Sequence, residues 1–290
     1  MRKIIILIPI YNDWKSFQKL VLEINNNIKG IKNFLFDCIV INDASTVDQP
    51  SLSKPENINS LKILNMKENK GHARCNAFGI RYINQNENFD YLILMDGDGE
   101  DRPEEIKDLI NKIQQNHDSS VVAKRIKRSE GIFFSFLYSI HKLITFIFTG
   151  KKINFGNFSC LTKYDVNKIS SQASLWSSYS GTIKKCITNL NEISSIRGER
   201  YFGPSKMSLY KLIIHSFSII AVFKYHVLLR AIILFLLLTY LKTYIGLISI
   251  FLQILLVLFN LAIFVVALRE KKKELIKCHE NLKSIDKFTH

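Results

Sequence analysis

The sequence predicts an α/β domain with a mostly parallel sheet, followed by helices that lie on a membrane and cross it. Short apolar runs alternate with amphipathic helical patterns over residues 1–125, which predicts strands and helices in turn. The last third of the chain holds two long apolar stretches, which predict a transmembrane helical hairpin.

Composition narrows the classes of partner. The net charge of +15 suits a nucleic acid, an anionic membrane surface or a phosphorylated substrate. The basic residues gather around apolar segments, which favours the membrane first, phosphates second, and no nucleic acid. The five cysteines are scattered without a metal-binding spacing, so disulfides and structural zinc are not expected.

A continuous apolar run predicts a strand buried on both faces at 4–8, and another buried strand is predicted at 91–95. Further strands are predicted at 34–41, 61–64 and 121–123. Between them, apolar residues at spacings of three and four predict helices. The first helix should begin after Asp13 and end at Gly30, the second should span 73–83, and the third should begin at Pro103.

The aromatic-rich segment 131–149 has two interpretations. It suits a core helix, or an amphipathic helix at the bilayer interface, because His141 and Lys142 interrupt any spanning run. The interfacial interpretation is the preferred one. Residues 207–223 carry Lys211 and His215 and predict a helix along the membrane surface.

Two segments are expected to cross the membrane. Residues 243–268 are uncharged and would reach roughly 39 Å as a helix. Residues 226–241 are shorter and could span if Arg230 extends toward the headgroups. The basic flank that begins at Arg269 favours the cytoplasm, and an even number of crossings places both chain ends there. The predicted divisions are 1–206 (catalytic), 207–225 (juxtamembrane), 226–268 (hairpin) and 269–290 (basic cytoplasmic tail).

Polar residues follow the predicted strands at the edge where parallel sheets bind ligands. An acidic turn, Asp96-Gly97-Asp98-Gly99-Glu100-Asp101, comes directly after a buried strand. Two carboxylates separated by one small residue can hold Mg²⁺ or Mn²⁺ against a diphosphate, because these ions prefer oxygen ligands. The alternative is an ordinary acidic turn that caps the following helix.

Four motifs together carry a family resemblance: 8–13 (IPIYND), 40–45 (VINDAS), 69–72 (NKGH) and 96–104 (DGDGEDRPE). In this order and at strand ends, they resemble the family 2 glycosyltransferases of GT-A fold. Within that family the chain is most similar to polyprenyl-phosphate sugar transferases with two C-terminal membrane helices. The resemblance covers roughly residues 3–105 and is looser beyond them.

The resemblance implies roles for the motif residues. Asp96, Asp98 and Glu100 would hold the metal ion, and Asp96 would also contact the donor. The nucleotide-sugar pocket would further include Pro9, Tyr11, Asp13, Asp43 and Gly71. Asp13 stands where relatives more often carry glutamate, which leaves its contact with the nucleoside open. His72 would shape the adjoining loop or be a simple loop histidine.

Basic residues complete the implied site. Arg125 and Arg128 follow the last strand, and Arg197, Arg200, Ser205 and Lys206 precede the membrane segment. The guanidinium fork suits phosphate. Arg200 and Lys206 would act in catalysis with Asp96 and Asp98, and Arg125, Arg128, Arg197 and Ser205 would bind the acceptor phosphate. An alternative is a basic patch attracted to anionic lipid. Asn157 stands where some relatives carry an aspartate, and an amide cannot act as a base.

The sequence thus predicts a metal-dependent membrane enzyme that moves a sugar from a UDP- or GDP-linked donor to a polyprenyl phosphate, on the cytoplasmic face of a bacterial inner membrane. One alternative is a glycosyltransferase that acts on a glycan or lipid head-group hydroxyl in surface polysaccharide assembly. Another is an inactive membrane scaffold of the same fold. Homo-oligomerisation stays open. A processive synthase is disfavoured because the Gln-x-x-Arg-Trp motif is absent, and an oxidoreductase because no GxGxxG follows the first strand.

Overall fold

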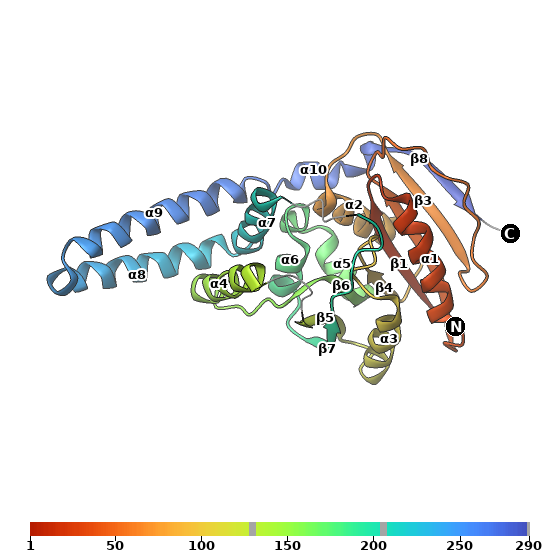
Figure 1. Cartoon of the computed structure of the whole chain (residues 1–290), viewed down its shortest axis with the longest axis horizontal. Coiled ribbons are helices and arrows are strands. Elements are labelled where there is room, and N and C mark those ends of the chain that lie inside the picture. The colour runs from red at the N-terminus through yellow and green to blue at the C-terminus, as the bar shows by residue number, and fades with distance from the viewer. Residues whose placement is uncertain (128–131, 204–207, 289–290) are drawn as a thin grey trace.

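A computed structural model describes residues 1–127, 132–203 and 208–288. The soluble part is built on an eight-stranded sheet of order β7-β5-β6-β4-β1-β2-β3-β8, from which a long helical pair projects (Figure 1). The strands are β1 (Arg2–Ile10), β2 (Phe34–Asn42), β3 (Ser60–Met66), β4 (Tyr91–Leu94), β5 (Ser120–Lys127), β6 (Phe155–Thr162), β7 (Leu190–Ile196) and β8 (Leu282–Phe288).

The sheet is mixed. The pairings β1–β2, β1–β4, β2–β3 and β5–β7 are parallel, whereas β6 runs antiparallel to β4 and β5, and β8 antiparallel to β3. The chain order reverses beside β1, which pairs with β2 on one side and β4 on the other. Such a switch point places the carboxyl ends of two parallel strands side by side, where α/β sheets bind ligands.

The isoleucine-rich first strand shows why both faces must be covered. Ile4, Ile6 and Ile8 join one apolar cluster with α1 and α3, whereas Ile5 and Leu7 join a second one on the opposite face. Because side chains alternate across a strand, a continuous apolar run is the expected signature of a strand buried on both faces. All five of these side chains are fully buried.

The predicted helices are confirmed, with shifted bounds. The helices of the soluble part are α1 (Trp14–Ile28), α2 (His72–Asn86), η1 (Pro103–Glu105), α3 (Ile106–Gln115), α5 (Lys163–Ser170), η2 (Ala173–Trp176) and α6 (Tyr179–Cys186). The strands β6, β7 and β8 and the helices α5 and α6 were not predicted. Their segments are short and mix polar with apolar residues, so neither period stands out.

Two apolar helices form the hairpin that projects from the domain in Figure 1, α8 (Lys224–Ile245) and α9 (Leu247–Ala267), joined at Gly246. Both are long and apolar enough to cross a membrane. Of the most apolar part of each helix, only 6% and 17% is buried in the protein, whereas the core helix of a soluble domain is mostly buried. Polar contacts join the two helices, as Gln253 donates to the Thr239 hydroxyl at 2.8 Å.

Two further helices lie at the base of the hairpin, α4 (Ile132–Thr149) and α7 (Leu209–Ala221). The end of α7 is fixed to the domain, because Ile219 joins the apolar cluster that lies against the sheet. Arg230 of α8 donates to the Ile147 carbonyl at 2.9 Å. It therefore caps the carboxyl end of α4, where a positive charge is favourable.

The chain returns to the sheet after the hairpin through α10 (Lys272–Ile276), η3 (Cys278–Asn281) and β8. The sequence analysis assigned 269–290 to a basic tail, but the structure folds most of this segment into the domain. Leu275 and Cys278 are buried in the apolar cluster beneath α2, and β8 pairs with β3 in a register that sets Ile285 opposite Leu64. The many charged residues of this segment hide its apolar pattern in the sequence, although a few apolar residues pack it against the domain.

The contact between Arg230 and α4 is open to test. We expect Arg230→Leu to lower the free energy of unfolding by about 2 kcal/mol, the typical contribution of a hydrogen bond to a charged group. Thermal unfolding in detergent would measure the loss. Lys242→Leu, which changes an exposed lysine of the same helix, is the matched control, and equal shifts for the two variants would contradict the capping role.

Candidate functional site

The acidic turn after β4 forms the centre of the candidate site. The Asp96 amide donates to the Asp101 carboxylate at 2.9 Å, which closes the turn. A Cβ atom at Gly97 would lie 2.9 Å from the Pro9 carbonyl oxygen, closer than such atoms approach. Glycine therefore lets the turn lie directly against the carboxyl end of β1, at the switch point of the sheet.

Asp96 is held by two side chains. Its Oδ1 accepts a hydrogen bond from Asn157 of β6 at 2.9 Å and lies 3.2 Å from Nε2 of His72. Burial would raise the pKa of Asp96, but the nearby His72, Asn157 and Arg125 lower it overall. Burial would lower the pKa of His72, and the Asp96 carboxylate outweighs that effect and raises it. This pairing keeps Asp96 ionised.

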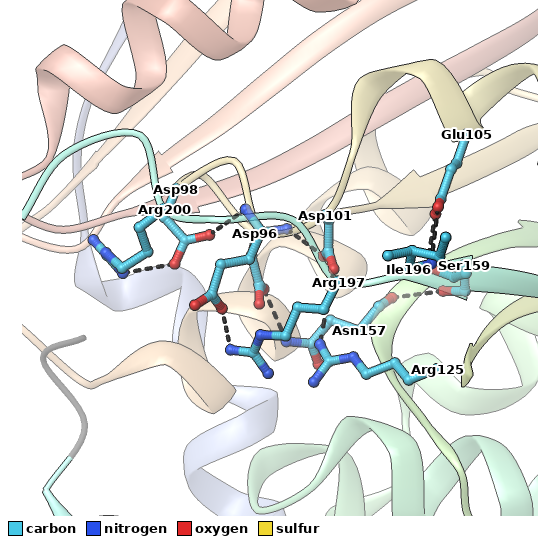
Figure 2. Close-up of polar contacts among 12 residues, drawn as sticks. Asp96, Asp98, Asp101, Glu105, Arg125, Asn157, Ser159, Ile196, Arg197 and Arg200 are labelled. Carbon is cyan, nitrogen blue, oxygen red and sulfur yellow. Dashed lines mark hydrogen bonds and ion pairs between the residues drawn. The ribbon is translucent and has the colours of Figure 1, made fainter. Parts of the chain in front are cut away.

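Arg200 bridges two carboxylates that come from different strand ends. Its guanidinium lies 2.6 Å from Asp98 and 2.6 Å from Asp13, at the start of α1. Asp13 thus occupies the N-cap position without capping the helix through its side chain. Figure 2 shows Arg200 beside Asp98. The contact brings together three residues that the sequence analysis placed in one site.

The segment 197–203 lies across the acidic turn. The Gly198 amide donates to the Glu100 carbonyl at 2.8 Å, and the Tyr201 amide donates to the Asp98 carbonyl at 3.0 Å. Arg197 forms an ion pair with the Glu100 carboxylate. Two backbone hydrogen bonds therefore join this segment to the acidic turn, and ion pairs between their side chains add to the contact.

Carboxylates are crowded at the turn. Burial, then the charges of Asp96 and Glu100, raises the pKa of Asp98 to about 6. Burial, then the charge of Asp96, raises the pKa of Asp101 to about 7, although Arg125 lies 3.8 Å away. Burial and neighbouring carboxylates thus both disfavour the ionised forms of Asp98 and Asp101, and a bound cation would offset this effect.

Asp43 serves the neighbouring loop. Its two carboxylate oxygens accept from the backbone amides of Lys70 and Gly71, both at 2.8 Å. Burial raises the pKa of Asp43 in spite of these bonds. Gly71 has φ of +86° and precedes α2, so the loop needs glycine at this point. Tyr11 is 42% exposed at the end of β1, where a ligand can reach it.

The predicted site residues fall into three groups. The structure brings Asp13, Asp96, Asp98 and Arg200 together, with Glu100, Arg197 and Arg125 in the adjoining shell. Pro9, Tyr11, Asp43 and Gly71 line the strand ends beside them. Arg128, Ser205 and Lys206 lie outside the described residues.

Some residues of the site were missed or undervalued. The sequence shows only that the Asn157 amide cannot act as a base. In the structure this side chain donates a hydrogen bond to Asp96 and orients it. Asp101 was treated as part of a capping turn, and Tyr201, whose ring packs on Gly99, was not singled out.

The fit to a metal ion rests on few ligands. Among the described residues, no group of three or more His, Cys, Asp or Glu side chains is placed to hold a metal ion. Glu100 faces Arg197. Asp96 and Asp98 nevertheless supply hard oxygen ligands on one short turn, so they suit an ion that takes its remaining ligands from a diphosphate and water.

A model of the glycosyl transferase family 2 matches residues 5–177 of the chain. Among curated proteins, the chain is 26% identical over 225 residues to an undecaprenyl-phosphate 4-deoxy-4-formamido-L-arabinose transferase of Photorhabdus laumondii. It is 26% identical over 223 residues to the protein of the same name from Yersinia enterocolitica. Each match covers 73% of this chain but only 65% of the relative's length.

Solved structures share the fold at low identity. A glucosyl-3-phosphoglycerate synthase of Mycobacterium tuberculosis, in complex with Mn²⁺, UDP-glucose and phosphoglyceric acid, aligns with a TM-score of 0.52 at 14% identity, over 78% of this chain and 80% of that one. A mannosyltransferase of Pyrobaculum calidifontis, in complex with GDP-mannose and Mn²⁺, aligns with a TM-score of 0.51 at 12% identity, over 92% and 87%.

The raised pKa of Asp101 predicts how stability depends on pH. The folded protein favours the protonated form, so this contribution is full below the usual aspartate pKa, about 4, and disappears as the pH rises through about 7. We expect metal-free protein to have a lower melting temperature at pH 8 than at pH 5.5. Asp101→Asn, which resembles the protonated form, should flatten this slope.

The control for that measurement is Asp108→Asn, on the first turn of α3 and exposed. It should keep the slope of the unchanged protein. An unchanged slope in Asp101→Asn would show that the carboxyl group is ionised at neutral pH in the folded state.

Proposed function

The chain belongs to glycosyl transferase family 2, and on this premise we propose that it transfers a sugar from a nucleotide-sugar donor to a polyprenyl phosphate. The observation that carries the proposal is the acidic turn at the switch point of the sheet, with arginines from distant segments around it. Carboxylates that can hold a cation, beside guanidinium groups, complement a donor diphosphate and an acceptor phosphate.

The nucleoside binds at the ends of β1 and β2. Tyr11 is exposed there, and Pro9 is the last residue but one of β1. Asp13 reaches the site from the start of α1. Asp43 acts through the loop that it holds, because both of its oxygens already accept backbone amides. Gly71 allows that loop to approach the nucleoside closely.

Asp96 and Asp98 hold the divalent cation, Mg²⁺ or Mn²⁺. When bound, the cation neutralises charge on the departing diphosphate. Burial and the charges of Asp96 and Glu100 raise the pKa of Asp98, and this supports the assignment because a bound cation favours the ionised carboxylate. Glu100 joins the ligands only if it leaves Arg197.

Arg200 stabilises the leaving group. Its guanidinium is paired with Asp13 and Asp98, which places it at the edge of the proposed donor site. A guanidinium can donate two parallel hydrogen bonds to a phosphate. Lys206 adds a second positive charge, and Arg125, Arg128, Arg197 and Ser205 receive the acceptor phosphate.

The reaction forms a bond from an acceptor phosphate oxygen to the anomeric carbon, while the bond from that carbon to the diphosphate breaks. The nucleoside diphosphate leaves with the electron pair. A phosphate is already ionised near neutral pH and needs no strong base, which agrees with an asparagine at position 157. An acceptor hydroxyl would need a base, and Asn157 cannot provide one.

The hairpin supports a lipid acceptor, and so do the names of the relatives, which are undecaprenyl-phosphate transferases. The helices α4 and α7 lie between the hairpin and the site and would guide the lipid phosphate to it. Because β8 rejoins the sheet, both ends of the hairpin lie on the side of the catalytic domain. The basic flank from Arg269 onward favours the cytoplasmic face of a bacterial inner membrane.

The test is an assay of membranes containing the chain with labelled UDP- and GDP-sugars and polyprenyl phosphate. We expect label in the lipid extract, lost with EDTA and reduced at least about 100-fold in Asp98→Ala, because charge stabilisation of the leaving group is lost. Asp108→Ala, outside the site, should retain full activity.

The outcomes separate the alternatives. Label found only on a glycan or a head-group hydroxyl would overturn the polyprenyl phosphate assignment. Nucleotide binding without transfer to any acceptor would indicate an inactive scaffold. Full transfer in EDTA would remove the metal from the proposal.

A further inference from the structure

The segment that follows the membrane hairpin forms hydrogen bonds with the loop 67–71, which borders the proposed donor site. The Asn281 side chain donates to the Glu68 carbonyl at 3.0 Å and accepts from the Glu68 amide at 3.1 Å. The Asn281 carbonyl also accepts from the Lys67 amide at 2.8 Å. One residue of η3 thus binds two consecutive residues of this loop through three hydrogen bonds.

The other end of the same loop is held by Asp43, which accepts the amides of Lys70 and Gly71. Residues 67–71 are therefore fixed at both ends, by Asp43 from the end of β2 and by Asn281 from beyond the hairpin. The loop leads directly into α2, whose first residue, His72, contacts Asp96. The loop therefore connects the segment after the hairpin with the start of α2.

A second chain of hydrogen bonds connects β8 with the end of β2. The Asn65 amide group donates to the Asp286 carboxylate at 2.8 Å, and the Asn65 oxygen accepts from Asn42 at 2.8 Å. The Asn42 oxygen accepts from the Ser45 amide at 3.1 Å. Side chains therefore link β8, β3 and β2 in sequence, and the last link fixes the turn after β2.

We propose that Asn281 and Asp286 are positioning residues of the donor nucleotide pocket, supplied by the segment after the membrane hairpin. The inference rests on the proposed function, because it takes the ligand to be a nucleoside diphosphate. Asn281 and Asp286 hold the two loops that border this ligand, 67–71 and 43–45, before it binds. Loops that are already ordered lose less conformational entropy on binding, so the ligand binds more tightly.

This role lies outside the matched family region, which ends at residue 177. A chain that lacked residues 278–288 would still contain all four family motifs. Its loop 67–71 would lack the hydrogen bonds from Asn281, and the chain of hydrogen bonds that leads to the loop 43–45 would lack Asp286. The segment after the hairpin therefore contributes residues that position the loops of the donor site.

The experiment measures the binding of UDP and GDP, each with Mn²⁺, to the full chain in detergent by titration calorimetry. For whichever nucleotide binds, we expect Asn281→Ala to weaken binding about five- to tenfold, as expected for the loss of one or two exposed hydrogen bonds. Asp286→Ala should weaken it similarly. Asp286→Asn should retain most of the affinity, because its amide oxygen can still accept from Asn65.

Lys283→Ala is the matched control, since Lys283 lies on the same strand with an exposed side chain. It should bind the nucleotide like the unchanged chain. Melting temperatures are measured for every variant, and binding is compared well below them. In the sugar-transfer assay, KM for the donor should rise in Asn281→Ala while kcat stays within about twofold, because the proposed role of Asn281 is to order a loop that borders the nucleotide.

Equal nucleotide affinity in Asn281→Ala and the unchanged chain would overturn the inference, and so would an equal loss in Lys283→Ala. Failure of the unchanged chain to bind either nucleotide would overturn it together with the proposed function. Nucleotide binding that depends on Asn281, with no sugar reaching polyprenyl phosphate, would support the inference and remove only the acceptor assignment.

Discussion

The crowding of carboxylates after β4 is the constraint on which the rest of the site depends. Asp96, Asp98, Glu100 and Asp101 fall within one turn, and burying several like charges is unfavourable unless positive or donor groups surround them. Those groups come from distant parts of the chain: His72 from α2, Arg125 from β5, Asn157 from β6, and Arg197 and Arg200 from the segment after β7. The strands β5 and β6 and the segment after β7 therefore supply side chains that compensate the negative charge of the turn.

The sequence was sufficient for elements with a strong periodic signal. Ile4–Ile8 and the apolar stripe of α3 predicted their strand and helix because burial on two faces, or on one stripe, leaves a regular pattern. The three later strands β6, β7 and β8 follow no such pattern. Phe155–Thr162 is antiparallel between two strands that are distant in the sequence, and only tertiary pairing makes it a strand. The same holds for β8, which is hidden among charges.

A similar division applies to the site. Residues that act directly at a strand end, such as Asp98, can be found because motif and position coincide there. Residues that act through another side chain cannot, because their contribution depends on a contact between distant segments. Asn157 and Asn281 are ordinary asparagines in the sequence, and only their partners, the Asp96 carboxylate and the Glu68 backbone, give them a role. The pairing of Arg200 with both Asp13 and Asp98 is likewise a property of the fold.

The two connections of the hairpin to the domain determine how the site meets a membrane. Before the hairpin, Ile219 buries the end of α7 in the domain core. After it, Trp176 donates to Glu274 at 3.1 Å and β8 completes the sheet. At the base, Lys224 of α8 pairs with Glu270 beyond α9 at 2.7 Å. A domain held by one flexible linker could rotate freely, whereas attachment on both sides fixes its orientation. The distance between the hairpin and the site is then set by the protein, and under the proposed function a lipid-borne phosphate would meet the donor in one geometry.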